Sequence, residues 1–444
     1  MLVCGIDIGS TNLKVALVDG AGRPVWLRVV PTPRVRDALG PVTDADVLAE
    51  AIAALVAEGW REVGNGAPLA AIATAGVGED GLGLDAALAP VAPAIPWFDR
   101  RAAPEAARLA AGPAATPRAG IVMDETRTGA KWLWLRRHRP DLAAASRVWV
   151  ALADYPLVAW GAEPFMSETL AARTGCYDVA ARDWIPALLD ACGAPPVPAV
   201  AVAGRVVGTV TRGPLLASGA ATRGTLLVAG GHDHPVAAAA IHRLDPAARL
   251  DSLGTANVAY GEAPRFVPDR LDPRVAFVPP IEGGAGLGCL GVIEFSAALA
   301  AVAPEAEVRA FLAAPRLPGA PSPVRPLGAP AAGLRALLES AAMAARAMFD
   351  TMAAVGVPAA PIYATGGWSR SHGLLELRAS VLGVTVHAVD VPELTVIGAA
   401  GFAARGCGVT LDFRPAVTTV EPLAAWAAAY QDHYAALRAR TEAT

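Results

Sequence analysis

Asp233 is the residue that the sequence places best for acid–base chemistry. Residues 226–229 are apolar and predict a buried strand, which Gly230 and Gly231 end, and Pro235 with the alanines after it predicts the start of a helix. Asp233 therefore lies at a strand-to-helix corner, where a carboxylate can accept a proton from a substrate hydroxyl. The same corner also suits an N-cap, whose carboxylate accepts hydrogen bonds from unpaired backbone N–H groups. Both interpretations are open at this point.

A glycine-hydroxyl turn near the N-terminus offers a second chemical site. Gly9, Ser10 and Thr11 separate two apolar segments, and such a turn exposes successive backbone N–H groups together with two hydroxyls, which suits an anion. Asp7, just before the turn, could hold Mg²⁺ through water, because Mg²⁺ keeps most of its hydration shell. An ordinary hairpin turn is the alternative interpretation of these residues.

The second half of the chain repeats this pattern. A strand, a turn with Gly254 and Thr255, and a returning strand follow one another over residues 249–260, as they do over residues 2–19. The second turn would add further phosphate donors from the other half of the molecule. The sequence therefore contains a weak internal repeat.

A glycine pair before a predicted helix is the third candidate for phosphate or nucleotide binding. Gly366 and Gly367 would let a nucleotide approach the backbone closely, and the helix N-terminus that follows favours phosphate; a plain turn is the alternative. No Gly-x-x-x-x-Gly-Lys-Ser/Thr occurs, which excludes a P-loop, and no Gly-x-Gly-x-x-Gly opens a Rossmann unit.

Alternating strands and helices must position these residues. We predict a largely parallel sheet covered on both faces, and hence an α/β fold. The expected strands are residues 2–8, 13–19, 24–30, 69–74, 206–211, 226–229, 249–253, 258–260, 361–365 and 384–389, and the clearest helices are 44–63, 331–355, 371–382 and 395–405.

Composition narrows the class of protein. A chain of 444 residues is long enough for two or three domains, and its net charge of −4 without a basic tail argues against nucleic acid as a partner. No run of eighteen strongly apolar residues predicts a membrane span, and the N-terminus lacks the basic start of a signal peptide. The five cysteines are scattered without metal-ligand spacing, which is typical of reduced core residues. We therefore expect a cytoplasmic protein.

In this order and spacing, the motifs resemble the FGGY family of carbohydrate kinases over nearly the whole chain. The matching segments are 5–14, Trp97-Phe98-Asp99-Arg100-Arg101, 131–135, Asp154-Tyr155, Ser167 with Thr174-Gly175, 207–209, Gly230-Gly231-His232-Asp233, 252–255, 366–371, 382–383, Glu393 and 398–400. The resemblance implies two ribonuclease H-like, actin-like ATPase domains with a nucleotide and sugar cleft between them. Residues 1–244 would form the sugar-binding domain and residues 245–444 the nucleotide-binding domain.

The resemblance also implies an ATP-dependent reaction with Mg²⁺. Asp233 would be the general base toward a hydroxyl of a small sugar, a ketose such as a pentulose, or a polyol, and Asp7 would organise the metal. ATP would contact Gly9, Ser10, Thr11, Lys14, Gly254, Thr255, Gly366, Gly367 and Ser371, while the substrate would contact Glu79, Trp97, Asp99, Arg100 and Asp233. Family members are often dimers, so the resemblance allows a homodimer, although nothing in this sequence marks an interface. An actin-like or Hsp70-like ATPase and a catalytically inactive sugar sensor are the alternatives.

One loop departs from the family pattern and bears on the substrate. Val77-Gly78-Glu79-Asp80 stands where ketopentose kinases commonly carry Gln-Met-His-Gly and glycerol kinases Gln-Arg-Glu-Thr. Glu79 could bind hydroxyls, and Gly78 would leave room for a different or larger sugar. The alternatives are a solvated Glu79 and a local ion pair between Asp99 and Arg100. His232 and His234 are expected to be structural or polar neighbours of the base, since no third metal ligand is spaced to join them.

Overall fold

The computed structural model describes residues 1–64, 66–254, 256–265, 271–294, 299, 301, 303–314, 317, 321, 333–391 and 393–442 of the 444-residue chain. These residues form two compact units. One comprises Met1–Arg243, Arg265–Gly288 and Thr395–Arg414, and the other comprises Leu244–Pro264, Cys289–Leu394 and Pro415–Thr444. Each unit has its own sheet, which confirms the predicted α/β class. The assignment of sugar to residues 1–244 and of nucleotide to residues 245–444 stays a prediction.

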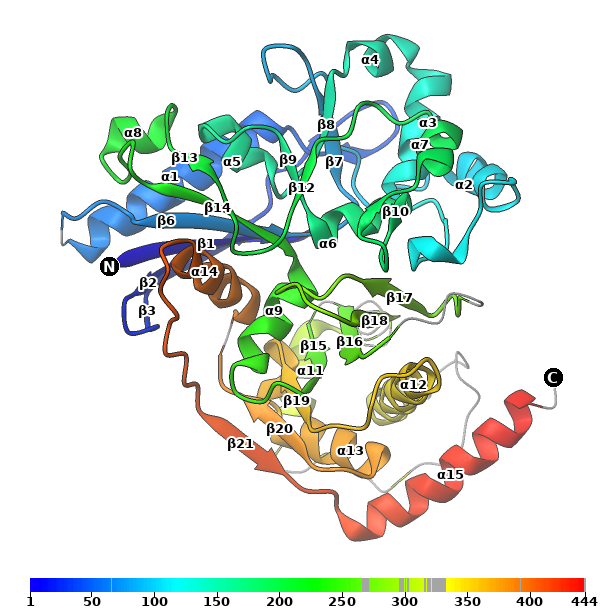
Figure 1. Ribbon diagram of the computed structural model, residues 1–444. Helices are drawn as coiled ribbons and strands as arrows, with labels where there is room; N and C mark the ends of the chain where they lie inside the picture. The colour runs from blue at the N-terminus through cyan, green and yellow to red at the C-terminus, as the bar shows by residue number, and fades with distance from the viewer. Residues whose placement is uncertain are drawn as a thin grey trace. The chain divides into compact units, whose positions relative to one another are not determined.

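The first unit is built on a six-stranded sheet with the order β13-β14-β6-β1-β2-β3 (Figure 1). Its strands are β1 (Leu2–Ile8), β2 (Asn12–Asp19), β3 (Pro24–Pro31), β6 (Ala71–Gly76), β13 (Val206–Thr209) and β14 (Leu226–His232). Strands β1, β6 and β14 run parallel to one another, whereas β2 pairs antiparallel with β1 and β3, and β13 pairs antiparallel with β14. All seven residues of β1 are buried, as expected for a central strand that is covered on both faces.

Two helices cover the two faces of this sheet near β1 (Figure 1). Helix α1 (Ala45–Val63) begins after Asp44, whose side chain accepts hydrogen bonds from the backbone of Asp46 and Val47. Helix α14 (Leu394–Gly406) lies directly against Gly5: a Cβ there would come within 2.0 Å of the Val396 carbonyl oxygen. A side chain at residue 5 would therefore push α14 off the sheet.

The rest of the first unit consists of short elements around that sheet. Its helices are α2 (Ala103–Ala110), α3 (Thr128–His138), α4 (Pro140–Ala145), α5 (Tyr155–Trp160), α6 (Glu168–Ala171), α7 (Pro186–Cys192), α8 (Pro214–Ser218) and α9 (Asp233–His242). Its short strands are β4 (Val35–Arg36), β5 (Pro41–Val42), β7 (Gly81–Leu84), β8 (Val148–Ala151), β9 (Phe165–Ser167), β10 (Tyr177–Asp178), β11 (Asp183–Trp184), β12 (Ala199–Ala201) and β17 (Val275–Val278).

The second unit repeats the strand arrangement of the first. Six strands of its sheet follow the order β18-β16-β15-β19-β20-β21, with β15 antiparallel to β16, parallel to β19, and β19 parallel to β20. The series β3-β2-β1-β6-β14-β13 has the same hairpin and the same parallel neighbours. This confirms the internal repeat. The strands are β15 (Arg249–Leu253), β16 (Ala256–Ala263), β18 (Leu287–Glu294), β19 (Ile362–Thr365), β20 (Val386–Val389) and β21 (Val417–Val420).

Helices α11 (Glu305–Leu312), α12 (Leu334–Ala354), α13 (His372–Leu382) and α15 (Ala424–Glu442) complete the second unit. Beneath them lies a fully buried ionic network. The Arg378 guanidinium of α13 lies 3.0 Å from the Asp251 carboxylate and donates to the Asn257 side chain at 2.7 Å, while Asn257 donates to Asp251 at 2.6 Å. This network joins α13 to the hairpin of β15 and β16.

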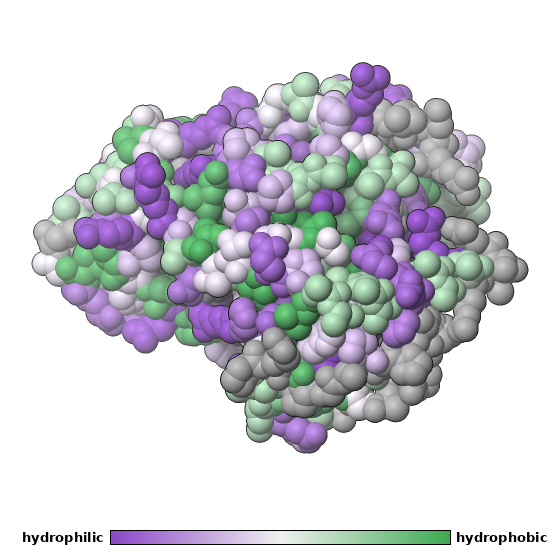
Figure 2. Space-filling model, turned by 90° about the horizontal axis from the view of Figure 1, so that it is seen from below, coloured by the Kyte–Doolittle hydropathy of each residue, from purple (hydrophilic) through white to green (hydrophobic). Residues whose placement is uncertain are grey.

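The surface and the cysteines agree with the composition. On the face drawn in Figure 2, hydrophobic side chains lie in small groups among hydrophilic ones. Within the described ranges, no helix has both the length and the hydrophobicity that a bilayer crossing requires. All five cysteines are free thiols, and four of them are buried.

Candidate active site

Three parallel strands end at the same edge of the first sheet and bring the candidate carboxylates together. Asp7 on β1 is paired in register with Ala75 on β6, and Ala75 is paired with Gly231 on β14. Loops that follow the carboxyl ends of parallel strands are the usual place for ligands in α/β sheets. Asp7 and Asp233, which are far apart in the sequence, therefore lie at one edge.

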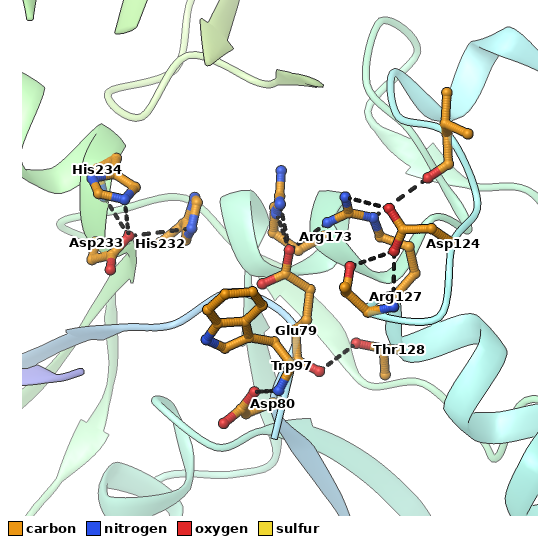
Figure 3. Close-up of polar contacts among 12 residues, drawn as sticks. Glu79, Asp80, Trp97, Asp124, Arg127, Thr128, Arg173, His232, Asp233 and His234 are labelled. Atoms are coloured by element: carbon orange, nitrogen blue, oxygen red, sulfur yellow. Dashed lines mark hydrogen bonds and ion pairs between the residues drawn. The ribbon is translucent and has the colours of Figure 1, made fainter. Parts of the chain in front are cut away.

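Asp233 is the first residue of helix α9, and its N-cap is His232, which makes no side-chain cap. The interpretation of Asp233 as the N-cap is therefore wrong. Its Oδ1 accepts a hydrogen bond from the His234 backbone N–H at 2.7 Å and lies 3.2 Å from Nε2 of His232 and 3.6 Å from Nε2 of His234 (Figure 3). All three contacts involve Oδ1. Because the side chain is 20% exposed, its other oxygen, Oδ2, can receive a substrate proton.

The surroundings of Asp233 favour a basic carboxylate. Burial raises its pKa above the ordinary value, and the charge of Asp7 raises it further, although His234 opposes the shift. A raised pKa makes the carboxylate a stronger proton acceptor. His232 is buried, and its burial, together with the positive charge of Arg173, holds its pKa well below the usual range, so that it stays neutral.

Asp7 fits a role in holding a hydrated divalent cation. Its Oδ2 accepts a hydrogen bond from Lys14 Nζ at 2.9 Å. Its Oδ1 is buried and has no hydrogen-bond partner in the part of the chain that the structure describes. An unpaired buried carboxylate oxygen is costly unless a cation or water satisfies it. No cluster of three or more His, Cys, Asp or Glu side chains suited to a metal occurs among the described residues.

The turn after Asp7 is fixed by hydrogen bonds from neighbouring segments. Gly9 N–H donates to the Asn12 carbonyl at 3.0 Å, which closes the turn. The Ser10 hydroxyl accepts a hydrogen bond from Trp97 Nε1 at 2.7 Å, and Arg34 donates to the Ser10 carbonyl at 3.0 Å. Thr11 is exposed at the tip. The predicted contact of Gly9, Ser10 and Thr11 with phosphate thus has a rigid, partly exposed turn to support it.

The segment around Trp97 is held by ion pairs that differ from the alternative Asp99–Arg100 pair. Asp99 pairs with Arg101 at 2.8 Å, and Arg101 in turn pairs with Asp37 at 2.8 Å. Arg100 points to Glu125 at 2.7 Å, and its side chain is 61% exposed. The alternative of an Asp99–Arg100 ion pair is therefore wrong, because Arg101 pairs with Asp99 and Arg100 pairs with Glu125. Asp99 anchors the segment, whereas the predicted substrate contacts of Trp97, Asp99 and Arg100 stay predictions.

Glu79 lies in a cluster of cations that the sequence did not reveal. Its side chain is buried, and its Oε1 accepts hydrogen bonds from Arg173 Nε at 2.9 Å, from Arg173 Nη2 and from Arg127 Nη1 (Figure 3). The alternative of a solvated Glu79 is therefore wrong. Burial alone would raise the pKa of Glu79, but the charges of Arg173 and Arg127 outweigh burial and lower it. Lys131 donates to the Glu79 carbonyl at 3.1 Å and fixes the loop.

Gly78 does not leave the empty space that we expected from the sequence. A Cβ at this position would lie 2.4 Å from Cγ of Arg173 and 3.1 Å from Cδ2 of His232. The stem of Arg173 therefore fills the volume that a side chain at residue 78 would occupy. The expectation of room for a larger sugar beside Gly78 is wrong, because Arg173, which lies 94 residues after Glu79, enters that space.

Asp80 makes the stability of the first unit depend on pH. Burial raises its pKa to about 6, against the charges of Lys131 and Arg34. The folded protein therefore binds this proton more tightly than the unfolded chain does. The resulting stability is present below the unfolded pKa of about 3.9 and is lost as the pH rises through 6.

We expect Asp80→Asn to remove this dependence. Urea unfolding at pH 4.5 and 7.5 should show that the wild type loses about 2 kcal/mol more stability over this range than the variant does. The Trp97 backbone N–H, which donates to Asp80 at 2.6 Å, keeps an acceptor in asparagine. An equal change in unfolding free energy between pH 4.5 and 7.5 in the two proteins would contradict the assignment of this pH dependence to Asp80.

The structure describes only some of the residues of the second unit that are predicted to contact the nucleotide. Thr255 lies outside the described residues, and Gly254 directly follows strand β15. Gly366 has φ of 91° and packs against Leu253, where a Cβ would lie 2.6 Å from the carbonyl oxygen, so this turn requires glycine. A Cβ at Gly367 would meet no described atom within 4 Å, so its backbone is open to a ligand.

Ser371 has a structural use. Its hydroxyl caps helix α13 by accepting from the Leu374 N–H at 3.2 Å, and it donates to the Leu312 carbonyl at 2.7 Å. Its contact with the nucleotide stays a prediction. When the two turns are aligned on Gly9 and Gly254, Ser252 stands in the place of Asp7, so the second turn lacks the carboxylate.

Known proteins resemble both halves of the chain. The model of the FGGY family of carbohydrate kinases, N-terminal domain, matches residues 2–240, and that of the C-terminal domain matches residues 295–407. A xylulose kinase of Streptomyces coelicolor is 29% identical over 433 residues, covering 91% of this chain and 87% of the relative. A glycerol kinase of Gloeobacter violaceus is 28% identical over 462 residues, covering 93% and 89%.

A solved structure gives the same result for the fold. The xylulose kinase from Rhodospirillum rubrum superposes with a TM-score of 0.83 at 24% identity and covers 100% of this chain and 98% of its own. The first family match alone spans more than half of the 444 residues. The chain therefore belongs to the FGGY family of carbohydrate kinases and is an ATP-dependent carbohydrate kinase.

Proposed function

We propose that this kinase phosphorylates a hydroxyl of a small ketose such as a pentulose, with Mg²⁺ as the metal and Asp233 as the general base. The observation that carries the proposal is the carboxylate of Asp233 at the sheet edge that it shares with Asp7, held through Oδ1, in a side chain that is 20% exposed. The similarity to xylulose kinases supports the ketose, and the similarity to a glycerol kinase keeps polyols in the test.

The chain's own residues would act mainly by positioning and by charge. The His234 N–H and His232 fix Oδ1 of Asp233, and Oδ2 accepts the proton of the substrate hydroxyl as its oxygen forms the bond to phosphorus. Bound MgATP would supply the γ-phosphoryl group, whose bond to the bridging oxygen of the β-phosphate breaks so that ADP leaves, and the charge of the metal. Asp7 and Lys14 would hold the metal and the phosphates at the same edge. Phosphoryl transfer needs little more than such positioning.

Asp7→Asn tests the metal part of the proposal. Asparagine keeps an oxygen for Lys14 but removes the negative charge, so the Mg²⁺ concentration for half-maximal rate should rise by about 10- to 100-fold. The rate is measured at saturating ATP over a Mg²⁺ titration. Exposed Asp141, changed to asparagine, serves as the control. An unchanged Mg²⁺ titration in Asp7→Asn would show that Asp7 does not serve the metal.

The reaction itself is tested by ADP release from MgATP over a panel of ketopentoses, ketohexoses, aldonates and polyols, with identification of the phosphorylated product by mass spectrometry. Stimulation by a ketopentose supports the proposal. Stimulation by polyols alone would overturn the ketose assignment. ATP hydrolysis that no acceptor stimulates would favour an actin-like or Hsp70-like ATPase. Binding of a sugar without turnover would favour a catalytically inactive sugar sensor.

A further inference from the structure

Arg173 has an unused donor group in a buried position. Its side chain is only 6% exposed, and its Nε and Nη2 both donate to Oε1 of Glu79. Its Nη1 is buried and has no hydrogen-bond partner within the described ranges. A buried donor without a partner costs free energy, and a guanidinium group can only donate. Nη1 therefore calls for an acceptor that a ligand would bring.

The position of Arg173 connects it to the candidate base. Its Cγ and Cδ2 of the His232 ring both lie beside Gly78, at 2.4 Å and 3.1 Å from the point where a Cβ would stand. His232 in turn lies 3.2 Å from Asp233. A small substrate whose hydroxyl meets Asp233 would thus have its other end beside Arg173 and Glu79, as the arrangement in Figure 3 allows.

Glu79 complements Arg173 in its chemistry. Arg173 and Arg127 both bind Oε1, and in Figure 3 no line ends on the other oxygen of the carboxylate. An ionised carboxylate can only accept hydrogen bonds, so Oε2 suits a hydroxyl of a ligand. Because Glu79 is shared by two guanidinium groups, the charge of Arg173 is only partly compensated by it. An acceptor oxygen that carries a negative charge or a large partial negative charge therefore fits best beside Nη1.

We propose that Arg173 determines specificity by donating from Nη1 to a carbonyl or carboxylate oxygen of the substrate, while Glu79 accepts from the neighbouring hydroxyl. The substrate end away from Asp233 is thus an α-hydroxy carbonyl group, as in an open-chain ketose or an aldonate. An alditol offers only hydroxyls, and a hydroxyl that accepts from Arg173 must place its own proton elsewhere in a buried site. This inference rests on the proposed function, because it concerns the other end of the same substrate.

The test compares a ketopentose, the aldonate and the alditol of the same carbon number. Binding is measured by calorimetry without ATP, and kcat and KM are measured with MgATP, for the wild type, Arg173→Met and Arg173→Lys. The wild type should prefer the ketose or the aldonate over the alditol by about 10- to 100-fold, the range expected for a hydrogen bond to a charged group. Arg173→Met should bring the ratio of ketose or aldonate preference over the alditol close to one, chiefly by changing KM. Arg173→Lys should retain only part of the wild-type ratio.

Two further variants separate specificity from folding. Gly78→Ala should displace the stem of Arg173 and lower the same ratio. Arg212→Met removes a guanidinium group that donates to the Ala159 and Val158 carbonyls, and it serves as the matched control with an unchanged ratio. Thermal unfolding of each variant shows whether the fold is retained.

The outcomes distinguish this inference from the proposed function. Preference for the ketose identifies a carbonyl, and preference for the aldonate identifies a carboxylate; both support the inference. Equal binding of the alditol by the wild type, no binding of any of the three, or an unchanged ratio in Arg173→Met would overturn it. The proposed function fails separately, if no acceptor is phosphorylated although the calorimetric preference is present.

Discussion

Asp233→Asn is expected to lower kcat by about 10²- to 10⁴-fold, the range for loss of a positioned general base, with little change in the KM for the sugar. Asparagine keeps the oxygen that accepts from the His234 N–H, so the corner between β14 and α9 should retain its shape. The variant loses only the ability to take the proton of the attacking hydroxyl. Exposed Asp141, changed to asparagine, is the control and should retain full activity.

The pH dependence of the same enzyme gives a second readout of Asp233. The carboxylate must be deprotonated to act, so kcat/KM should rise with pH as Asp233 loses its proton. Burial raises this pKa, and Asp7 raises it further, so the acid limb should lie above the ordinary range of aspartate. Asp233→Asn should abolish this limb. A limb that persists in the variant would assign the base to another group.

Arg378→Met is expected to be the most destabilising substitution in the second unit. Arg378 is fully buried and pairs with Asp251 at 3.0 Å, and it also donates to the Ala341 carbonyl and to Asn257. Its removal leaves the Asp251 carboxylate buried without a charge partner. The loss should be about 3–5 kcal/mol, and it is measured from the urea transition in which the second unit unfolds.

A triple variant separates the cost of leaving a buried charge unpaired from the net contribution of the network to stability. Replacing the three buried polar residues together, as Asp251→Leu, Asn257→Leu and Arg378→Met, removes the side chains that pair with one another, so no buried charge is left unpaired, and should recover most of the lost stability. Arg309→Met, which breaks an exposed pair with Glu305, is the control and should cost less than about 1 kcal/mol. A loss of that small size in Arg378→Met would contradict the account.

The sequence could predict the parts of the site that depend on local pattern. The strands, the glycine turn after Asp7 and the strand-to-helix corner at Asp233 each follow from a few neighbouring residues. These features needed no knowledge of side-chain packing. The meeting of Asp7 and Asp233 at one edge depends on the order of β1, β6 and β14 in the sheet, which local pattern alone does not specify.

What the sequence could not predict depends on contacts between distant segments. Arg173 reaches Glu79 across 94 residues and fills the space beside Gly78, so the absence of a side chain at residue 78 did not mean an empty pocket. The choice of Arg101 over Arg100 as the partner of Asp99 depends on which way each side chain leaves the loop. One signal was available for Arg173: a charged residue directly after the apolar residues 170–172.

The central claim is that Asp233 accepts the proton from a sugar hydroxyl during transfer of the γ-phosphoryl group. It is tested most directly by single-turnover transfer from γ-labelled ATP, with enzyme in excess, to the acceptor that the panel identifies. We predict rapid labelling of the sugar by the wild type, and labelling slower by about 10²- to 10⁴-fold by a folded Asp233→Asn variant that still binds both substrates. Transfer at the wild-type rate by that variant would contradict the account.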